Sequence, residues 1–237
     1  MIPLTDRQGY KVLDHGLVAL VDYMGSDLSV VRNARVSYNA EWRSGEDEGK
    51  DAKLIHYLVK NGHTSPFEAV KFTFEVKAPI FVLRQWHRHR TWSYNEVSAR
   101  YTELPEEFYV PHPQVITTQS ADNKQMRTAV QHPDASSFER VIRENNAAQF
   151  TVYRYLLEKG CPRELARSVL PLGTYSHMFA TVDLHNLMHF LRLRLHEHAQ
   201  YEIRVYANAI LAIISAVCPV SVHAFCHKYG IQMETDL

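Results

Sequence analysis

The sequence has few cysteines, and they form no recognisable set. Cys161, Cys218 and Cys226 are the only three in 237 residues, and no Cys-x-x-Cys spacing joins them. This pattern excludes a disulfide framework and a thiol redox motif, and it fits a reducing cytosol. None of the three lies next to an evident activating base in the sequence, so a nucleophilic cysteine is not indicated.

Net charge and long apolar runs are also lacking. Lysine plus arginine and aspartate plus glutamate are equal at 26 each, so the chain has no overall positive field to draw it onto nucleic acid or an acidic membrane. No stretch approaches the ~20 apolar residues that a membrane-spanning helix needs, and residues 1–16 are too polar for a signal peptide. A cytoplasmic location is predicted, and any recognition of anions must be local.

Several short catalytic motifs are missing. There is no Gly-x-Ser-x-Gly nucleophile elbow, no Walker or Gly-x-Gly-x-x-Gly phosphate loop, and no His-Glu-x-x-His or cysteine-based zinc spacing. His87 with His89, and His196 with His198, are pairs two residues apart, which on a helix point about 200° away from each other. We therefore expect no metal site, and any nucleotide must be held by arginine side chains.

The apolar fraction of 46% indicates a globular protein, and we expect a single domain over residues 1–237. Residues 17–21 and 72–76 are predicted strands, the second because apolar and polar residues alternate along it. Helical spacing and end signals predict helices at 27–34, 51–61, 80–87 and 138–159, another from Pro162, and a long one from near Val182 to Val205. Strands early and helices late favour an α+β fold, with an antiparallel sheet packed against long helices. The polar residues 115–137 are predicted to form a long surface loop with one helical turn.

The most informative stretch lies between Arg84 and Tyr101, where four arginines, two histidines and one acid occur in a protein of zero net charge. Guanidinium groups bind phosphate and carboxylate through rigid forked donors. The side chains of Ser93, Asn95 and Ser98 add neutral hydrogen-bonding groups. The stretch therefore predicts a pocket for a small anion.

A second clue is an arginine within an apolar helix stripe. At 100° per residue, one face of the predicted long helix carries Leu187, Leu191, Arg194, His198, Tyr201 and Val205. A charge in that position must face a cavity or pair with a core or interface carboxylate, and both interpretations stay open. Arg167, which is also flanked by apolar residues, is a weaker candidate.

The segment from Arg88 to Ser98 matches the pattern Arg-His-Arg-x-x-Ser-x-Asn-Glu-x-Ser at all seven fixed positions in eleven. In this it resembles the flavin-dependent thymidylate synthases. The likeness covers nearly the whole chain outside the polar stretch at 115–137. Further matching segments are residues 34–38, 62–68, 78–82, 162–164, 166–167, 193–194 and 198–200.

The resemblance implies a homotetramer whose active sites lie between subunits, with FAD held across chains. It implies methylation of dUMP to dTMP, with methylenetetrahydrofolate as carbon donor and NADPH as reductant of the flavin. The implied dUMP contacts are Gln85, Trp86, His87, Arg88, Glu96, Val97, Ser98, Ala99, Arg100, Arg167 and Arg194. Arg194 is the implied catalytic residue, which polarises the uracil, favours loss of its N3 proton and makes C5 more nucleophilic.

The implied FAD contacts are Ser65, Arg88, His89, Arg90, Glu96, Asp183, Leu184, His185 and His189. Members of the family often carry asparagine at the position of Asp183, and a carboxylate cannot donate the hydrogen bond that an amide can. The family delivers hydride from reduced flavin and needs no enzyme nucleophile, which agrees with the lack of an activated cysteine. Ser98 is accordingly interpreted as a hydrogen-bonding contact to the nucleotide and not as a nucleophile.

One interpretation from another class remains open. A non-catalytic nucleotide- or RNA-binding protein could use the same arginines, with Trp86, Trp92 and Tyr94 as stacking surfaces. The zero net charge counts against it. Binding and reduction of a flavin distinguish the two.

Overall fold

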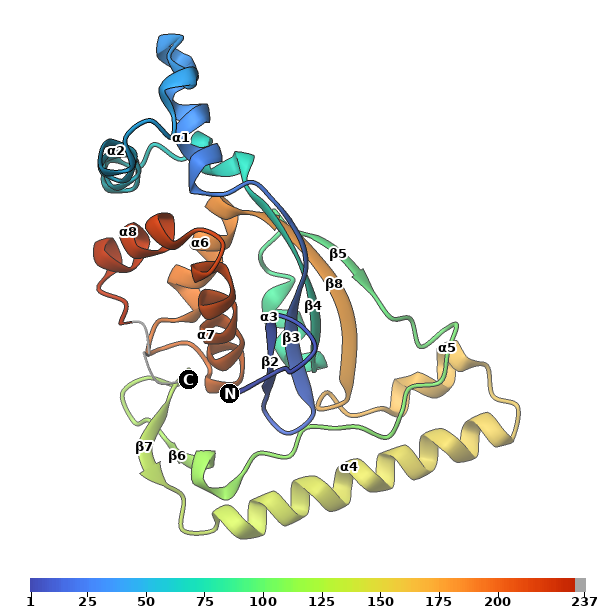
Figure 1. Cartoon of the computed structure of the whole chain (residues 1–237). Coiled ribbons are helices and arrows are strands. Elements are labelled where there is room, and N and C mark those ends of the chain that lie inside the picture. The colour runs from blue at the N-terminus through green and yellow to red at the C-terminus, as the bar shows by residue number, and fades with distance from the viewer. Residues whose placement is uncertain (233–237) are drawn as a thin grey trace.

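The computed structural model describes residues 1–232 and shows an α+β fold built on one six-stranded antiparallel sheet (Figure 1). The strands lie in the order β1-β2-β3-β4-β8-β5. Their bounds are Ile2–Pro3 for β1, Gly9–Val12 for β2, Gly16–Met24 for β3, Lys71–Pro79 for β4, Ser93–Glu96 for β5 and Tyr175–Asp183 for β8. The predicted fold class and antiparallel sheet are therefore confirmed.

The two predicted strands lie in the middle of the sheet. Residues 17–21 fall within β3 and residues 72–76 within β4, and these strands pair with each other. Phe72 and Phe74 have no exposed surface, because alternate residues of β4 point into the core. The sequence does not predict β8, since the outward-facing Phe179, 45% exposed, hides its alternation of polar and apolar residues.

Helices cover one face of this sheet. Their bounds are Asp27–Arg35 for α1, Glu48–Asn61 for α2, Ile80–Trp86 for α3, Ala135–Glu158 for α4, Arg163–Ala166 for α5, Leu184–Arg194 for α6, Tyr201–Ser215 for α7 and Pro219–Tyr229 for α8. Helices α6, α7 and α8 lie together on one side of the sheet, and α1 and α2 lie beyond one end of it (Figure 1). Within residues 1–232, none of the helices is long and apolar enough to cross a membrane.

The ends of several helices follow the predicted signals. Helix α2 stops at Gly62, whose φ of 70° is the left-handed conformation that glycine adopts without strain. Pro162 directly precedes α5, which is only one turn long and continues as the 3-10 helix η5 (Arg167–Val169). The predicted helices at 27–34, 51–61 and 80–87 are confirmed, with small shifts at their ends.

The long helix predicted over residues 182–205 is instead two helices. Helix α6 ends at Arg194, and the chain turns before α7 begins. Within the turn, the His198 N–H donates to the ring of His196 at 3.2 Å, which takes the place of a helical hydrogen bond. The predicted stripe is therefore correct only from Leu187 to Arg194, and His198 beyond it is exposed.

The segment at 115–137 is more ordered than the predicted loop. Its elements are a 3-10 turn, η4 (Pro113–Val115), and a hairpin of β6 (Thr117–Gln119) with β7 (Arg127–Gln131). Hydroxyl groups of Thr118 and Thr128 hydrogen-bond across the hairpin at 2.6 Å. Because both of its short strands are largely polar, the sequence shows none of the alternation that announces a strand.

Helix α4 does not pack on the sheet with the other long helices. It runs across one end of the molecule (Figure 1), where Phe150 and Tyr153 form a separate small core with Ala166 of α5. The expectation that long helices cover the sheet therefore holds for α6 and α7 and is wrong for α4.

His56 predicts a pH-dependent stability. Burial, reinforced by His223 and His227 of α8, lowers the pKa of His56 from its usual value of 6.5. The unfolded chain takes up this proton as the pH falls through about 6.5 while the folded chain does not, so the stabilisation is complete above that pH and is lost below it. Urea unfolding at about pH 7.5 and about pH 5.5 should show a smaller loss of stability for His56→Gln than for wild type. Equal losses would contradict this role of His56.

Candidate functional site

The arginine-rich segment covers the end of α3, the loop that follows it and β5, and aromatic side chains anchor it. Trp86 lies on Phe190 of α6 with ring centres 4.9 Å apart, and it meets Trp92 edge-on at 5.8 Å. The Tyr94 hydroxyl lies 3.1 Å from the Trp86 carbonyl and 2.9 Å from the His89 carbonyl, and it can donate to either. These contacts fix the backbone on which the charged side chains are carried.

Burial of these rings contradicts two predictions. Trp86 is 0% exposed and Trp92 6% exposed, so neither ring can stack on a base, and the Tyr94 hydroxyl is used inside the loop. The RNA-binding interpretation thereby loses its stacking surface. The Trp86 side chain is likewise not placed to contact dUMP, because it fills the core between α3, α6 and α7.

The arginines of the same loop point outward. Arg84, Arg88 and Arg90 are exposed, and within residues 1–232 none of them forms a hydrogen bond, an ion pair or a ring contact. Uncompensated guanidinium groups so close together raise the local positive potential and attract anions. The charge imbalance seen in the sequence therefore persists in the fold.

Arg194 lies at the end of α6, and its side chain contacts the arginine-rich segment. Its Nε donates to His89 Nε2 at 3.0 Å and its Nη2 to the Gln85 carbonyl at 3.2 Å. In the described part of the chain, no carboxylate lies within ion-pair distance of Arg194. Both acceptors are neutral, and desolvation lowers the pKa of this guanidinium from its usual value. A core salt bridge is thus not the reason for Arg194, and its charge is available to a ligand.

His89 supports Arg194 as a neutral acceptor. Burial, and then the charges of Arg194 and His189, lower the pKa of His89 to about 4. At neutral pH the ring therefore carries one proton, and since Nε2 accepts from Arg194 we assign that proton to Nδ1. Its ring packs edge-on against Phe190 at 4.9 Å, which fixes the direction in which Nε2 points.

The second half of the segment gathers around Glu96. Ser176 Oγ donates to Glu96 Oε1 at 2.6 Å, and His87 Nε2 lies 3.7 Å from Glu96 Oε2. The Ser98 hydroxyl accepts the Arg100 N–H at 3.3 Å, and among residues 1–232 no base contacts it. This geometry fits the predicted hydrogen-bonding role of Ser98.

Arg100 and Arg167 meet at Glu164. Arg100 Nε lies 3.9 Å from the Glu164 carboxylate, and Arg167 Nε donates to the Glu164 carbonyl at 3.4 Å. Arg167 is exposed and does not lie in the apolar surroundings that its neighbours in the sequence suggest. Beside these cations, Val97 is 37% exposed and Ala99 only 8%. The fold therefore brings two arginines, far apart in the sequence, to one edge of the site.

Two of the nine expected FAD residues, His185 and His189, line a small cavity. A cavity of about 160 Å³ opens between η3 (Ser65–Ala69), α6 and α8, and His63, His185, His189 and Arg192 are among its lining residues. Burial, followed by the charges of Arg192 and His185, lowers the pKa of His189, so this ring is neutral at neutral pH. Ser65 is exposed at the start of η3. The sequence did not single out Arg192, the one cation that α6 presents to this cavity.

Two expected FAD contacts are instead used by the fold. Asp183 caps α6, where Oδ1 accepts the Asn186 N–H at 2.9 Å and Oδ2 accepts Asn186 Nδ2 at 2.7 Å. The Leu184 side chain is fully buried, and its N–H donates to the Val70 carbonyl at 2.8 Å. Flavin contacts by these two side chains are therefore not supported by the geometry.

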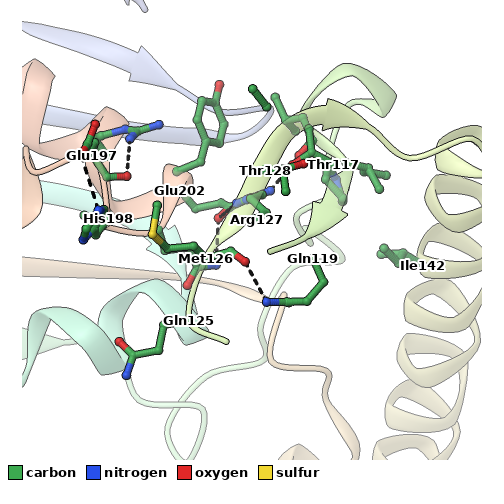
Figure 2. A pocket seen from close by; sticks show the side chains of 18 residues that line it. Thr117, Gln119, Gln125, Met126, Arg127, Thr128, Ile142, Glu197, His198 and Glu202 are labelled. Carbon is green, nitrogen blue, oxygen red and sulfur yellow. Dashed lines mark hydrogen bonds and ion pairs between the residues drawn. The ribbon is translucent and has the colours of Figure 1, made fainter. Parts of the chain in front are cut away.

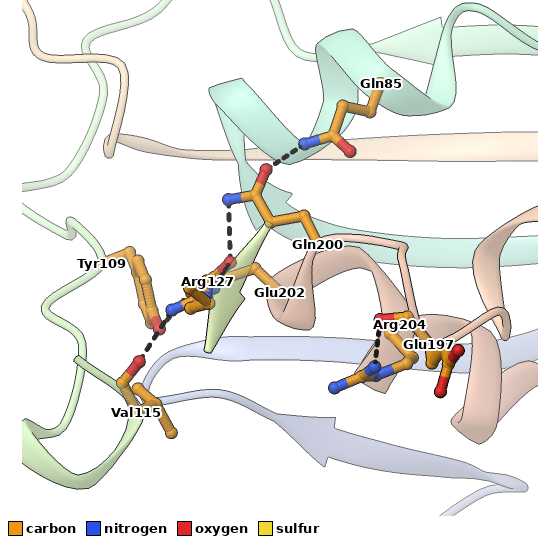
Figure 3. Close-up of polar contacts among 8 residues, drawn as sticks. All are labelled: Gln85, Tyr109, Val115, Arg127, Glu197, Gln200, Glu202 and Arg204. Atoms are coloured by element: carbon orange, nitrogen blue, oxygen red, sulfur yellow. Dashed lines mark hydrogen bonds and ion pairs between the residues drawn. The ribbon is translucent and has the colours of Figure 1, made fainter. Parts of the chain in front are cut away.

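A larger cavity, about 660 Å³, lies between the β6–β7 hairpin and residues 197–204 (Figure 2). Arg127, Thr128, Gln200 and Glu202 are among the residues that line it. None of the arginines of the 84–101 segment lines this cavity. Its link to the site described above passes through Gln200, whose Oε1 accepts from Gln85 Nε2 at 2.5 Å (Figure 3).

Neither Gln200 nor Glu202 is among the site residues predicted from the sequence. A lone acid among apolar residues is the same signal that singled out Arg194. On a single helix from 182 to 205, at 100° per residue, Glu202 lies only about 20° from Leu191, at the edge of the apolar stripe. In the structure Glu202 lies in the first turn of α7 and is 3% exposed, so the signal was present in the sequence and was overlooked.

The cysteines lie outside this site. Burial, followed by the charge of Asp27, raises the pKa of Cys218 to about 12, and burial also raises that of Cys226. Cys161 donates only to the neighbouring Pro162 carbonyl, at 3.8 Å. The two buried sulfurs are thus thiols at neutral pH, and a thiol is a poor nucleophile.

A known protein family matches this chain. The family model described as "Thymidylate synthase complementing protein" matches residues 19–220. The chain belongs to this family. A flavin-dependent thymidylate synthase from Treponema denticola is 49% identical over 231 residues, which make up 96% of this chain and 86% of that protein. One from Thermotoga neapolitana is 48% identical over 219 residues, 92% of this chain and 94% of the relative.

The solved structure of a methylase shares the fold. A UMP/dUMP methylase from Streptomyces cacaoi, bound with 5-Br dUMP, superposes with a TM-score of 0.84 at 37% identity, over 93% of this chain and 98% of that one. The predicted membership of the flavin-dependent thymidylate synthases, and with it the class of methyltransferase enzymes, is confirmed.

The neutral state of His89 can be measured directly. An NMR titration of the histidine rings should give His89 a pKa of about 4, with its proton on Nδ1 at neutral pH. Arg194→Gln should raise this pKa, because the variant removes the nearest positive charge. A titration of His89 near 6.5 in wild type would contradict the assigned geometry.

Proposed function

We propose that this chain converts dUMP to dTMP, with methylenetetrahydrofolate as the carbon donor and NADPH-reduced FAD as the source of hydride. The observation that carries the proposal is the uncompensated Arg194 guanidinium, held by His89 and by the Gln85 carbonyl at the edge of an arginine-rich loop. The methylase with a TM-score of 0.84, bound with 5-Br dUMP, supports a uracil nucleotide as substrate. A homotetramer with active sites shared between subunits, and a cytoplasmic location, stay predictions.

The nucleotide anion fits the second half of the segment. A nucleoside monophosphate carries a phosphate, and Arg88, Arg100 and Arg167 are exposed guanidinium groups that can bind one bidentately. The Ser98 hydroxyl and the Gln85 amide add neutral partners that fix the orientation of the ligand. We assign these residues to dUMP.

The residues around the smaller cavity fit a flavin nucleotide. Its lining combines the cations Arg192 and Lys228 with His63, His185 and the ring of Tyr229, so that charge for a pyrophosphate and flat rings for an adenine lie together. Arg88 and Arg90 have no partner in the described chain and add charge toward the same ligand. When bound, FAD supplies the reducing equivalents of the reaction.

Arg194 is the proposed catalytic residue. Its charge stabilises the negative charge that forms on the uracil ring when the N3 proton leaves, and this raises the nucleophilicity of C5 toward the incoming carbon. The neutral His89 holds Nε without compensating the charge, so the guanidinium keeps its full effect on the pyrimidine. Buried thiols with raised pKa values agree with chemistry that needs no cysteine nucleophile.

The flavin makes the proposal testable by colour. Protein purified and mixed with FAD should show the flavin absorption bands after removal of free FAD, and these should bleach when NADPH is added under nitrogen. A subsequent addition of dUMP and methylenetetrahydrofolate should yield dTMP. Protein that retains no FAD and forms no dTMP refutes the proposed function.

Arg194→Ala should separate catalysis from flavin binding. We expect dTMP formation to fall by about a hundredfold or more, because removing a group that stabilises developing charge typically costs that much. FAD binding should be retained, since the proposed role lies at the pyrimidine. Arg32→Ala, an exposed substitution on α1, serves as the matched control with unchanged turnover. If Arg194 were only structural, its loss would lower the melting temperature and leave the activity per folded molecule intact.

A further inference from the structure

Glu202 is a carboxylate buried in the first turn of α7, and its partners all donate to it. Arg127 Nη2 lies 2.8 Å from Oε1 and 2.6 Å from Oε2, and Gln200 Nε2 donates to Oε2 at 2.8 Å. The Tyr109 hydroxyl donates to Oε1 at 3.2 Å. All of the groups around this carboxylate donate, one of them from a cation, so each Glu202 oxygen acts here as an acceptor.

Arg127 belongs to the hairpin that lies outside the matching segments. Its Nη1 donates to the Val115 carbonyl at 2.8 Å (Figure 3). Its guanidinium also lies 5.7 Å from the ring centre of Tyr201. Two contacts besides Glu202 therefore hold the side chain. Through this residue the hairpin is joined to the start of α7.

The charge of Glu202 fixes the direction of two amides in series. Because Glu202 only accepts, Gln200 must turn its Nε2 toward the carboxylate, and its Oε1 then faces Gln85. Gln85 must in turn present Nε2, which donates to Gln200 Oε1 at 2.5 Å (Figure 3). The other N–H and the Oε1 of Gln85 are left for a ligand, beside the carbonyl that binds Arg194.

We propose that Arg127 and Glu202 are positioning residues for Gln85, which set the orientation of its amide toward dUMP. The proposal rests on the function proposed above, and it gives the β6–β7 hairpin a role in substrate binding. Loss of the Arg127 side chain removes the two hydrogen bonds that hold the Glu202 carboxylate in place. Gln200 and Gln85 then lose the acceptor that fixes their direction.

The first test measures dUMP binding to the FAD-loaded protein by calorimetry. Arg127→Met should raise the dissociation constant for dUMP about fivefold, the scale of one well-placed hydrogen bond, and the KM for dUMP should rise with it while kcat changes little. Arg127→Lys, which keeps the charge, should restore part of the affinity. Lys124→Met removes a cation from the tip of the same hairpin and should leave binding unchanged.

A second set of variants separates positioning from folding. Arg127→Met with Glu202→Leu removes both buried charges, which restores stability when the replacements pack well, yet the affinity for dUMP should stay low. Gln200→Ala, at an exposed site, should give the same loss even where Arg127→Met folds poorly. In a Gln85→Ala background, Arg127→Met should cause no further loss, because its effect passes through Gln85.

The outcomes distinguish the two proposals. Wild-type protein that neither binds dUMP nor forms dTMP overturns both. Wild-type protein that does both, combined with unchanged dUMP affinity in Gln200→Ala and in the double variant, overturns the positioning role alone. Additive losses of dUMP affinity from Gln85→Ala and Arg127→Met also overturn it, since additivity means that the two residues affect dUMP binding independently.

Discussion

The packing of Trp86 on Phe190 is the contact on which the candidate site depends. It joins the end of α3 to α6, so it fixes both the loop that carries the arginines and the helix that ends in Arg194. Loss of a buried aromatic side chain of this size costs about 3–5 kcal/mol in typical cores, more than most single polar contacts provide. The site's exposed cations therefore need not contribute to stability, because the rings beneath them do.

This protein has zero net charge but a positively charged site, because its ion pairs are distributed unevenly over the structure. Acids elsewhere are engaged with arginines of other elements, such as Asp51 with Arg35 and Glu202 with Arg127. In α3 and the loop after it, by contrast, Arg84, Arg88 and Arg90 have no acid partner within the described residues. Zero net charge and strong local anion binding are therefore compatible, and the total charge alone says little about what such a chain binds.

How far the sequence predicts this molecule depends on whether a signal is local. Local sequence is enough to predict β3, β4 and the arginine-rich segment, because periodicity and composition are signals that extend over only a few residues. Strand β5 is not, since Ser93–Glu96 is polar and becomes a strand only by pairing with β8. The break in the helix after Arg194 and the hairpin around Arg127 also depend on residues far away in the sequence. The burial of Glu202 depends on both of these features. Trp86 shows the same limit. Its neighbours in the sequence suggest a ligand contact, but its neighbours in the fold bury it in the core.

Arg194 and Glu202 show how one fold treats two buried charges in opposite ways. Glu202 accepts hydrogen bonds from Arg127 Nη2, from a phenol and from an amide. Burial of Tyr109, followed by the charge of Glu202, raises the pKa of that phenol, which therefore stays a donor. Arg194 receives only a neutral imidazole and a carbonyl. The hydrogen-bond networks of the two charges meet at Gln85. Its side chain is linked to Glu202 through Gln200, and its carbonyl accepts a hydrogen bond from Arg194. Glu202 is compensated by donors of its own chain, whereas Arg194 is held by neutral acceptors and faces no anion of the described chain. This contrast supports the proposed role of Arg194 at the substrate.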